Sequence, residues 1–254
     1  LHREVGYLFE ETFTENREQF YYELAEHFDK AEEYEKAVIY LEEAGSKARE
    51  LSDNKNAADF YFKLVHILEN SEYPANILDI KKHRWKPNNT SESENLSNYL
   101  SFHLILGDLF AITGQWDASE QLYKTIKPAF CSSKDIMQYA AYCNSLGYVY
   151  FLKGNFSDSR TWLCKGVDAC KENPNHDNYK AQLTYCLTNL SNLAIDEGHL
   201  EEAENILLEI QENISDAPSP KDNVYLYWSL GSLCKRQGKI TKSFTHFKKV
   251  HELC

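Results

Sequence analysis

The chain has few of the residues that interrupt helices: among 254 residues there are six prolines and ten glycines. With 43% hydrophobic and 26% charged residues, this scarcity is typical of an ordered, mainly helical protein. No stretch approaches the run of about eighteen apolar residues that a transmembrane helix needs, and residues 1–4 show no apolar signal segment. The sequence begins without methionine, so we expect it to be a piece of a longer protein.

The short motifs that mark common catalytic sites are also missing. We find no GxxxxGK[ST] phosphate loop, HExxH zinc helix, GxSxG elbow or GxGxxG turn. The nine histidines are scattered, and His246 and His251 lie five residues apart, a poor spacing for chelation from one helix face. We therefore expect no catalytic residue, no cofactor and no metal site, and a non-enzymatic role for this chain.

The cysteines point to a reducing environment. There are seven, an odd number, and no CxxC pair occurs. Several fall where the helical pattern buries small apolar side chains, so we interpret them as small hydrophobic residues and expect a cytoplasmic protein. Disulfide or metal chemistry is the alternative.

Charge is distributed unevenly along the chain. The net charge is −12, and residues 1–52 hold fourteen Asp or Glu against six Lys or Arg. Residues 225–254 reverse this, with six Lys or Arg against one Glu. The overall sign disfavours nucleic-acid binding. The basic end is either a solvated helix face or a docking patch for an acidic partner.

The stretch Cys143–Gly166 is typical of a helical hairpin. Leu146, Gly147 and Tyr150 share one helix face, because residues three and four apart lie on the same side. Gly154 follows as the residue that ends the helix. We expect the small side chain at 147 to allow a close approach of the second helix.

This pattern recurs around the small residues at positions 107, 191 and 231, at a period of 40 to 44 residues. Near the start it recurs around Ala25, with Glu32 where the others have glycine. The pattern resembles the tetratricopeptide repeat (TPR) family, in its long-repeat subgroup of maltose-activator regulators and kinesin light chains. The resemblance implies an all-α, right-handed superhelical solenoid of antiparallel helix hairpins, with about five to six repeats.

The repeat pattern predicts three segments. We expect an N-terminal helix plus two TPR-like hairpins over 1–70, an irregular linker or insertion over 71–95, and about four hairpins over 96–254. The first two hairpins are predicted to share residues 44–51. The basic run 81–86 is expected to belong to the insertion rather than to contact nucleic acid or phosphoinositide.

The N-terminal helix is predicted over residues 1–17. Val5, Leu8, Phe9 and Phe13 are expected on one side of it.

A narrower resemblance covers roughly the first 68 residues. The runs Leu1–Gly6, Tyr22–Phe28 and Lys36–Ala48 are similar to the start of the TPR region in class III (soluble-type) nucleotide cyclases and ATPase-linked signalling regulators. The resemblance implies a cyclase or ATPase module N-terminal to Leu1.

The inner groove of such a solenoid is the candidate binding surface. Asparagine can both donate to and accept from an extended backbone, and tyrosine and tryptophan supply rigid contact area. The groove-facing candidates are Asn144, Tyr148, Phe151, Tyr185, Asn189, Asn192, Tyr225, Trp228, Lys235 and Arg236. The alternative is that these side chains contact only one another or water.

The favoured function is a non-catalytic regulatory or scaffolding region of a larger cytoplasmic signalling protein, linked to a nucleotide cyclase or ATPase and binding a protein or extended peptide. One alternative is a free-standing adaptor for protein transport or assembly. Another is an allosteric small-molecule sensor. None of these uses nucleic acid or a membrane span.

Overall fold

The computed structural model describes residues 1–69, 78–79, 84–85, 92–132, 135–213 and 220–253. These residues form twelve α-helices, one short 3-10 helix and one pair of two-residue strands. In chain order they are α1 (His2–Thr12), η1 (Arg17–Phe20), α2 (Tyr21–Lys30), α3 (Tyr34–Glu50), α4 (Asn54–Glu69), β1 (Leu78–Asp79), β2 (Arg84–Trp85), α5 (Glu92–Ile112), α6 (Trp116–Ser132), α7 (Ile136–Leu152), α8 (Phe156–Lys171), α9 (Tyr179–Glu197), α10 (Leu200–Asn213), α11 (Pro220–Arg236) and α12 (Ile240–Leu253). The predicted all-α fold is confirmed.

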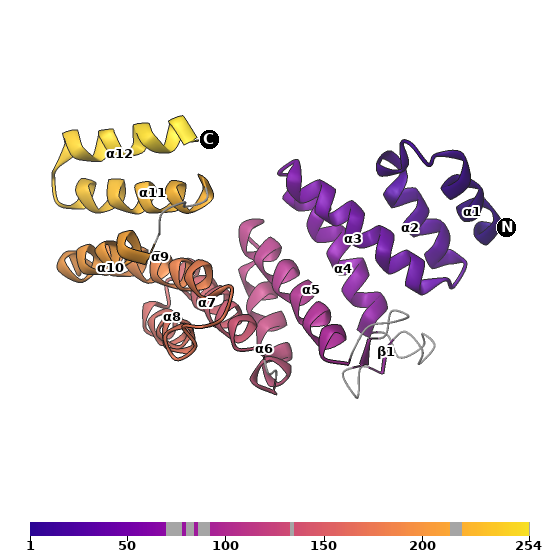
Figure 1. The fold of residues 1–254 in the computed structure, drawn as a ribbon, viewed down its shortest axis with the longest axis horizontal. Coiled ribbons are helices and arrows are strands. Elements are labelled where there is room, and N and C mark those ends of the chain that lie inside the picture. Colours follow the sequence, from indigo (N-terminus) through magenta and orange to yellow (C-terminus); the bar gives the residue numbers. More distant parts are fainter. Residues whose placement is uncertain (70–77, 80–83, 86–91, 133–134, 214–219, 254) are drawn as a thin grey trace. The chain divides into compact units, whose positions relative to one another are not determined.

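The chain forms two compact units, Leu1–Ser133 and Lys134–Cys254. Within each unit, consecutive helices pack side by side as hairpins (Figure 1). Most of the predicted insertion at 71–95 lies outside the described residues, so the three-part division stays a prediction. The segment is not irregular throughout, because β1 pairs antiparallel with β2 and α5 begins at Glu92.

The hairpin α7/α8 has the close helix contact at residue 147 and the helix end before Gly154 that the sequence predicts. A Cβ atom added at Gly147 would lie 2.8 Å from Leu163 Cγ on α8, so only glycine permits this approach. α7 ends at Leu152, and Gly154 takes a left-handed φ of 74° that L residues rarely adopt. The core of the second unit lies between the helices of its hairpins, where Leu163 is fully buried.

The same contact joins other hairpins, always between residues sixteen positions apart. A Cβ at the glycine would meet the later ring at 2.3 Å for Gly107 and Tyr123, 2.8 Å for Gly231 and Phe247, and 2.7 Å for Gly45 and Tyr61. The last pair joins α3 to α4, while α3 also packs against α2. α3 is therefore shared by two successive hairpins, as predicted for residues 44–51.

A serine on the second helix of three hairpins lies twelve residues after the glycine. Ser119 Oγ donates a hydrogen bond to the Gly107 carbonyl at 2.7 Å, and Ser243 Oγ donates to the Gly231 carbonyl at 2.8 Å. Ser159, the corresponding residue of α8, is fully buried, and its hydroxyl has no partner among the described residues. The serine hydroxyl at this repeat position is therefore hydrogen-bonded in two hairpins and without a described partner in the third.

Glu32 stands at the turn between α2 and α3, where the hairpins from α5 onward have glycine. It adopts a φ of 59°, in the same left-handed region. This conformation costs an L residue about 1 kcal/mol.

The N-terminal helix is shorter than predicted, because α1 ends at Thr12. Of the four residues expected on one side, Val5, Phe9 and Phe13 are half-buried, whereas Leu8 is 59% exposed. The buried side of α1 is centred on Gly6, where an added Cβ would lie 3.0 Å from the Phe28 ring. Leu8 is two residues from Gly6, so its side chain points to nearly the opposite side of the helix.

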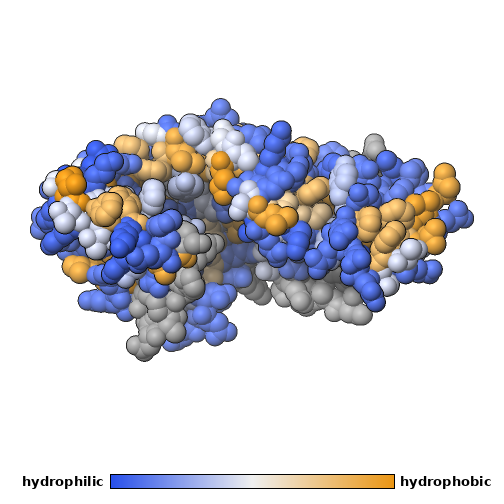
Figure 2. Space-filling view, turned by 90° about the horizontal axis from the view of Figure 1, so that it is seen from above, coloured by the Kyte–Doolittle hydropathy of each residue, from blue (hydrophilic) through white to orange (hydrophobic). Residues whose placement is uncertain are grey.

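The surface is mostly hydrophilic, with hydrophobic side chains in separate patches on the face that Figure 2 shows. No helix among the described residues is long and apolar enough to span a membrane. The six described cysteines form no disulfide with one another, and Cys143, Cys170 and Cys186 are fully buried.

Candidate functional site

The predicted groove residues lie on three adjacent helices of the second unit, since α7 packs against α9 and α9 packs against α11. The structure places Asn144, Tyr148 and Phe151 on α7, Tyr185, Asn189 and Asn192 on α9, and Tyr225, Trp228, Lys235 and Arg236 on α11.

Amide side chains link these helices in a row that we call the asparagine ladder (Asn144, Asn189, Asn192 with Ser229). Asn189 Nδ2 donates to Asn144 Oδ1 at 2.9 Å, and Ser229 Oγ donates to Asn192 Oδ1 at 2.9 Å. The three asparagines are half-buried. The Asn144 and Asn192 amino groups and the Asn189 carbonyl have no partner among the described residues, so the ladder retains both donors and acceptors.

The aromatic candidates make contacts of two kinds. Phe151 stacks on Phe156 of its own hairpin, with ring centroids 5.9 Å apart, and on Tyr148 at 6.2 Å. Tyr185 and Tyr225 instead meet edge to face across α9 and α11, at 5.8 Å. Phe151 therefore takes part in packing within its hairpin, whereas the tyrosine pair joins neighbouring hairpins.

A hollow lies at the C-terminal end of this unit, and we call it the terminal cleft. It has a volume of about 1000 Å³ and draws its lining from α9, α11 and α12. The lining residues are Ile195, Asp196, Trp228, Ser232, Lys235, Arg236, Phe247, Val250 and His251. Three of the ten predicted residues thus come together here, with α12 side chains that the sequence reasoning missed. The only hint of these α12 residues in the sequence was the excess of basic residues over 225–254, and a charge count does not show where in the fold the residues lie.

The terminal cleft combines an aromatic wall with free positive charge. Trp228 is 55% exposed, and its ring meets Phe247 edge to face at 5.3 Å. Arg236 donates to Asp196 Oδ1 at 2.9 Å, which ties α11 to α9. Lys235 has no partner among the described residues, so its charge is available to an incoming carboxylate.

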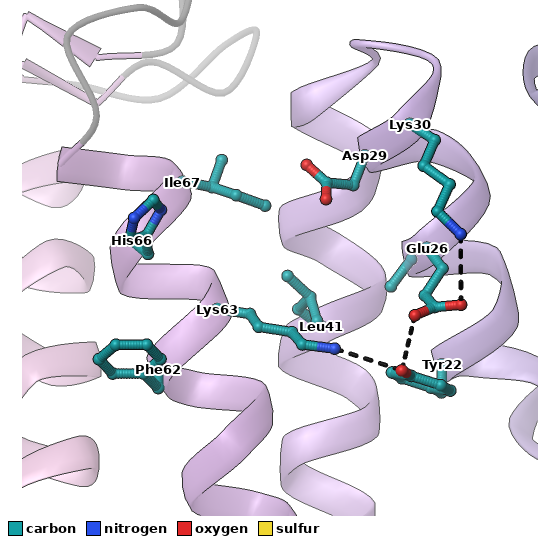
Figure 3. A pocket seen from close by; sticks show the side chains of 10 residues that line it. Tyr22, Glu26, Asp29, Lys30, Leu41, Phe62, Lys63, His66 and Ile67 are labelled. Carbon is teal, nitrogen blue, oxygen red and sulfur yellow. Dashed lines mark hydrogen bonds and ion pairs between the residues drawn. The ribbon is translucent and has the colours of Figure 1, made fainter.

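The first unit contains a smaller hollow between α2, α3 and α4, which we call the α2–α4 hollow (Figure 3). It measures about 290 Å³. The Tyr22 hydroxyl donates to Glu26 at 2.7 Å and accepts from Lys63 Nζ at 3.3 Å, which connects α2 to α4. The bond from Tyr22 is the main reason that the pKa of Glu26 is lowered. Lys30 lies 3.8 Å from the same carboxylate.

Other polar clusters serve to join helices. Arg160 on α8 donates to Glu202 at 2.6 Å and to Glu197 at 3.2 Å, and both carboxylates raise its pKa further. His103 is fully buried and lies 2.8 Å from Glu69. Among the residues that the structure describes, no three His, Cys, Asp or Glu side chains are grouped so as to hold a metal ion.

Comparison with solved structures reveals similar helical repeats. BtubC (BKLC) from P. vanneervenii aligns over 93% of this chain and 86% of its own, with a TM-score of 0.58 and 14% identity. A proposed kinesin light chain from Podosopora anserina, with nearly identical TPR-like repeats, aligns over 85% of this chain and 94% of its own, with a TM-score of 0.53 and 13% identity.

The fold is TPR-like. The apo form of RapI agrees, with a TM-score of 0.52 over 93% of this chain and 97% of its own at 10% identity. No protein-family model matches the sequence, and the search of curated proteins finds no match. At these identities the likeness concerns the TPR-like fold alone.

Proposed function

We propose that this TPR-like chain is a non-catalytic scaffold that binds a protein partner through an extended segment lying across α7, α9 and α11. The observation that carries the proposal is the asparagine ladder, in which Asn144, Asn189 and Asn192 keep unused donors and acceptors on adjacent helices. An extended backbone offers alternating N–H and C=O groups, which such amides can pair without regard to side-chain sequence.

The side chains beside the ladder suit the same ligand. Tyr185 and Tyr225 form a rigid aromatic pair between α9 and α11, which offers contact area at small entropic cost. Trp228, Lys235 and Arg236 continue the surface toward the terminal cleft. We assign binding to all ten predicted residues except Phe151, whose ring packs within its own hairpin.

Calorimetry with selected peptides tests the proposal. Random twelve-residue peptides displayed on phage are selected on the chain, and the winners are measured against wild type and Asn189→Ala. We expect about tenfold weaker binding, since the bound peptide covers these half-buried amides and the substitution leaves their partners unpaired. Asn173→Ala is the matched control, because the Asn173 side chain lies just beyond the end of α8 and donates to the Ala169 carbonyl of that helix, away from the ladder. Equal binding to all three proteins would refute the assignment of the ladder.

We further propose that the chain is the regulatory region of a larger cytoplasmic signalling protein with a class III cyclase or ATPase module. Support comes from the resemblance of residues 1–68 to the TPR region of such proteins. Sequencing the full-length transcript tests this. A cyclase motif or phosphate loop upstream of Leu1 is expected, whereas a start methionine directly before Leu1 would favour a free-standing adaptor.

A further inference from the structure

The α12 side chains of the terminal cleft occupy positions that are core in the preceding hairpin. Leu207 and Ile210 of α10 are 1% and 0% exposed, in a hairpin that α11 packs against. Phe247 and Val250 stand at the same repeat positions of α12, yet they are only half-buried and line the cleft. The cleft is therefore a place where this fold ordinarily receives another helix.

The chemistry of the surroundings limits which helix fits. Ile240 and Phe244 on α12 are 66% and 71% exposed, and Trp228 is 55% exposed, so the helix must offer apolar side chains. Lys235 and His251 line the cleft without partners among the described residues, and residues 225–254 hold six basic residues against one acidic. The fitting helix therefore presents carboxylates beside its apolar residues.

The chain carries such a helix at its own N-terminal end. Leu1, Glu4, Leu8 and Glu11 follow each other at spacings of three, four and three residues, so they form one stripe along α1. Leu1 is 89% and Leu8 59% exposed, and the Glu4 side chain is 85% exposed, with its carboxylate 3.8 Å from the Leu1 ammonium. The opposite side of α1 packs on α2 through Gly6, so the stripe faces away from its own unit.

We propose that the terminal cleft binds the outer face of α1 from a second copy of this chain. Leu8 and Leu1 contact Trp228 and the exposed α12 side chains, while Glu4 and Glu11 meet the basic residues of the cleft. The acidic excess of residues 1–52 and the basic excess of 225–254 steer the two copies together. This self-association does not require the asparagine ladder, although Trp228, Lys235 and Arg236 belong to both proposed surfaces.

The contact is head to tail, so each copy retains one free α1 and one free cleft. Such a contact adds copies without limit unless the rotation closes a ring. Because the face is small, we expect a dissociation constant on the order of tens of micromolar.

Sedimentation equilibrium of residues 1–254 tests the proposal. We expect the average mass to rise past that of a dimer between about 5 and 500 µM, and to rise less in about 500 mM than in about 50 mM NaCl, because salt screens the ion pairs. Glu4→Lys with Glu11→Lys, and separately Lys235→Glu, should each weaken self-association at least about tenfold. Glu172→Lys and Lys180→Glu are the matched charge reversals on exposed residues elsewhere.

Mixing supplies the decisive measurement. The two charge-reversed proteins, each weak alone, should associate when combined, because the intact α1 of one meets the intact cleft of the other. Circular dichroism and urea unfolding verify that each variant is folded. Three results would overturn the proposal. The first is a monomeric mass at all concentrations, and the second is a mass that stops at the dimer together with no association of the mixed variants. The third is self-association that both charge-reversed variants leave unchanged. Unchanged self-association of Asn189→Ala separates this result from that of the peptide groove.

Discussion

The α2–α4 hollow and the terminal cleft differ in what their charged groups do. In the hollow, the Tyr22 hydroxyl bonds both Glu26 of α2 and Lys63 of α4, so these polar groups link the two helices. In the cleft, Arg236 is paired with Asp196, but Lys235 is unpaired among the described residues. The bonded groups of the hollow gain little from a ligand, which must first break those bonds. Free charge beside exposed aromatic surface is therefore our reason for proposing that the cleft, and not the hollow, binds a partner.

The largest expected effect comes from two aromatic residues of nearly equal exposure. Trp228 in the cleft is 55% exposed and Phe62 in the hollow 53% exposed. We expect Trp228→Ala to weaken self-association about thirtyfold, because a central aromatic anchor contributes about 2 kcal/mol to binding. Phe62→Ala should leave self-association unchanged, and sedimentation equilibrium measures both. An equal loss of self-association in the two variants would show that the cleft and the hollow do not differ in binding.

The contrast between paired and unpaired groups extends into the hairpin cores. Ser119→Ala should lower the free energy of unfolding by about 1 to 2 kcal/mol, because the buried Gly107 carbonyl loses its donor. Ser159→Ala removes an equally buried hydroxyl that has no partner among the described residues, so it should be neutral or slightly stabilising. Urea unfolding of both variants measures the difference in unfolding free energy. Similar losses in the two variants would contradict the view that only the Ser119 hydroxyl stabilises its hairpin through a hydrogen bond.

A smaller loss is expected when the tyrosine link across the hollow is cut. Tyr22→Phe should destabilise the chain by about 0.5 to 1 kcal/mol, since the lost bonds are partly exposed to water. Tyr7→Phe is the control, because Tyr7 has the same 36% exposure and its hydroxyl has no partner among the described residues. Self-association should be unchanged in Tyr22→Phe, and a change would mean that the hollow also binds.

The smallest effect is the pH dependence of that link. The pKa of Glu26 is lowered in the folded chain, so its contribution to stability is complete above the ordinary value of 4.5 and is lost as pH falls below it. Wild type should therefore lose more unfolding free energy than Tyr22→Phe between about pH 6 and pH 3. Urea unfolding across this range measures it, and parallel curves would show that Tyr22 does not stabilise the carboxylate.

Much of the fold follows from local chemistry that the sequence displays directly. Gly147 and Gly154 predict a close helix crossing and a left-handed turn, and both are found. Glu32 occupies the same turn without glycine, because tertiary packing of α2 on α3 overrides its local preference. Leu8 is exposed although Val5, Phe9 and Phe13 are half-buried, because α1 buries only a narrow side around Gly6, and periodicity alone does not tell how wide the buried side is.

The candidate site was less predictable. The repeat spacing placed the ten candidates on α7, α9 and α11, but it did not reveal that Asn189 bonds Asn144. Phe247 and Val250 escaped prediction because the same repeat positions are core in the preceding hairpin. Whether such residues form core or binding surface depends on the neighbouring helix, which the spacing within one hairpin does not specify.

The sharing of α3 between two hairpins has a consequence for the dynamics of the first unit. Leu41 and Gly45 are both buried, and α3 packs against α2 and α4 alike, so α3 cannot detach without uncovering both neighbours. The backbone amides of these three helices should therefore exchange with deuterium through one common opening event rather than helix by helix.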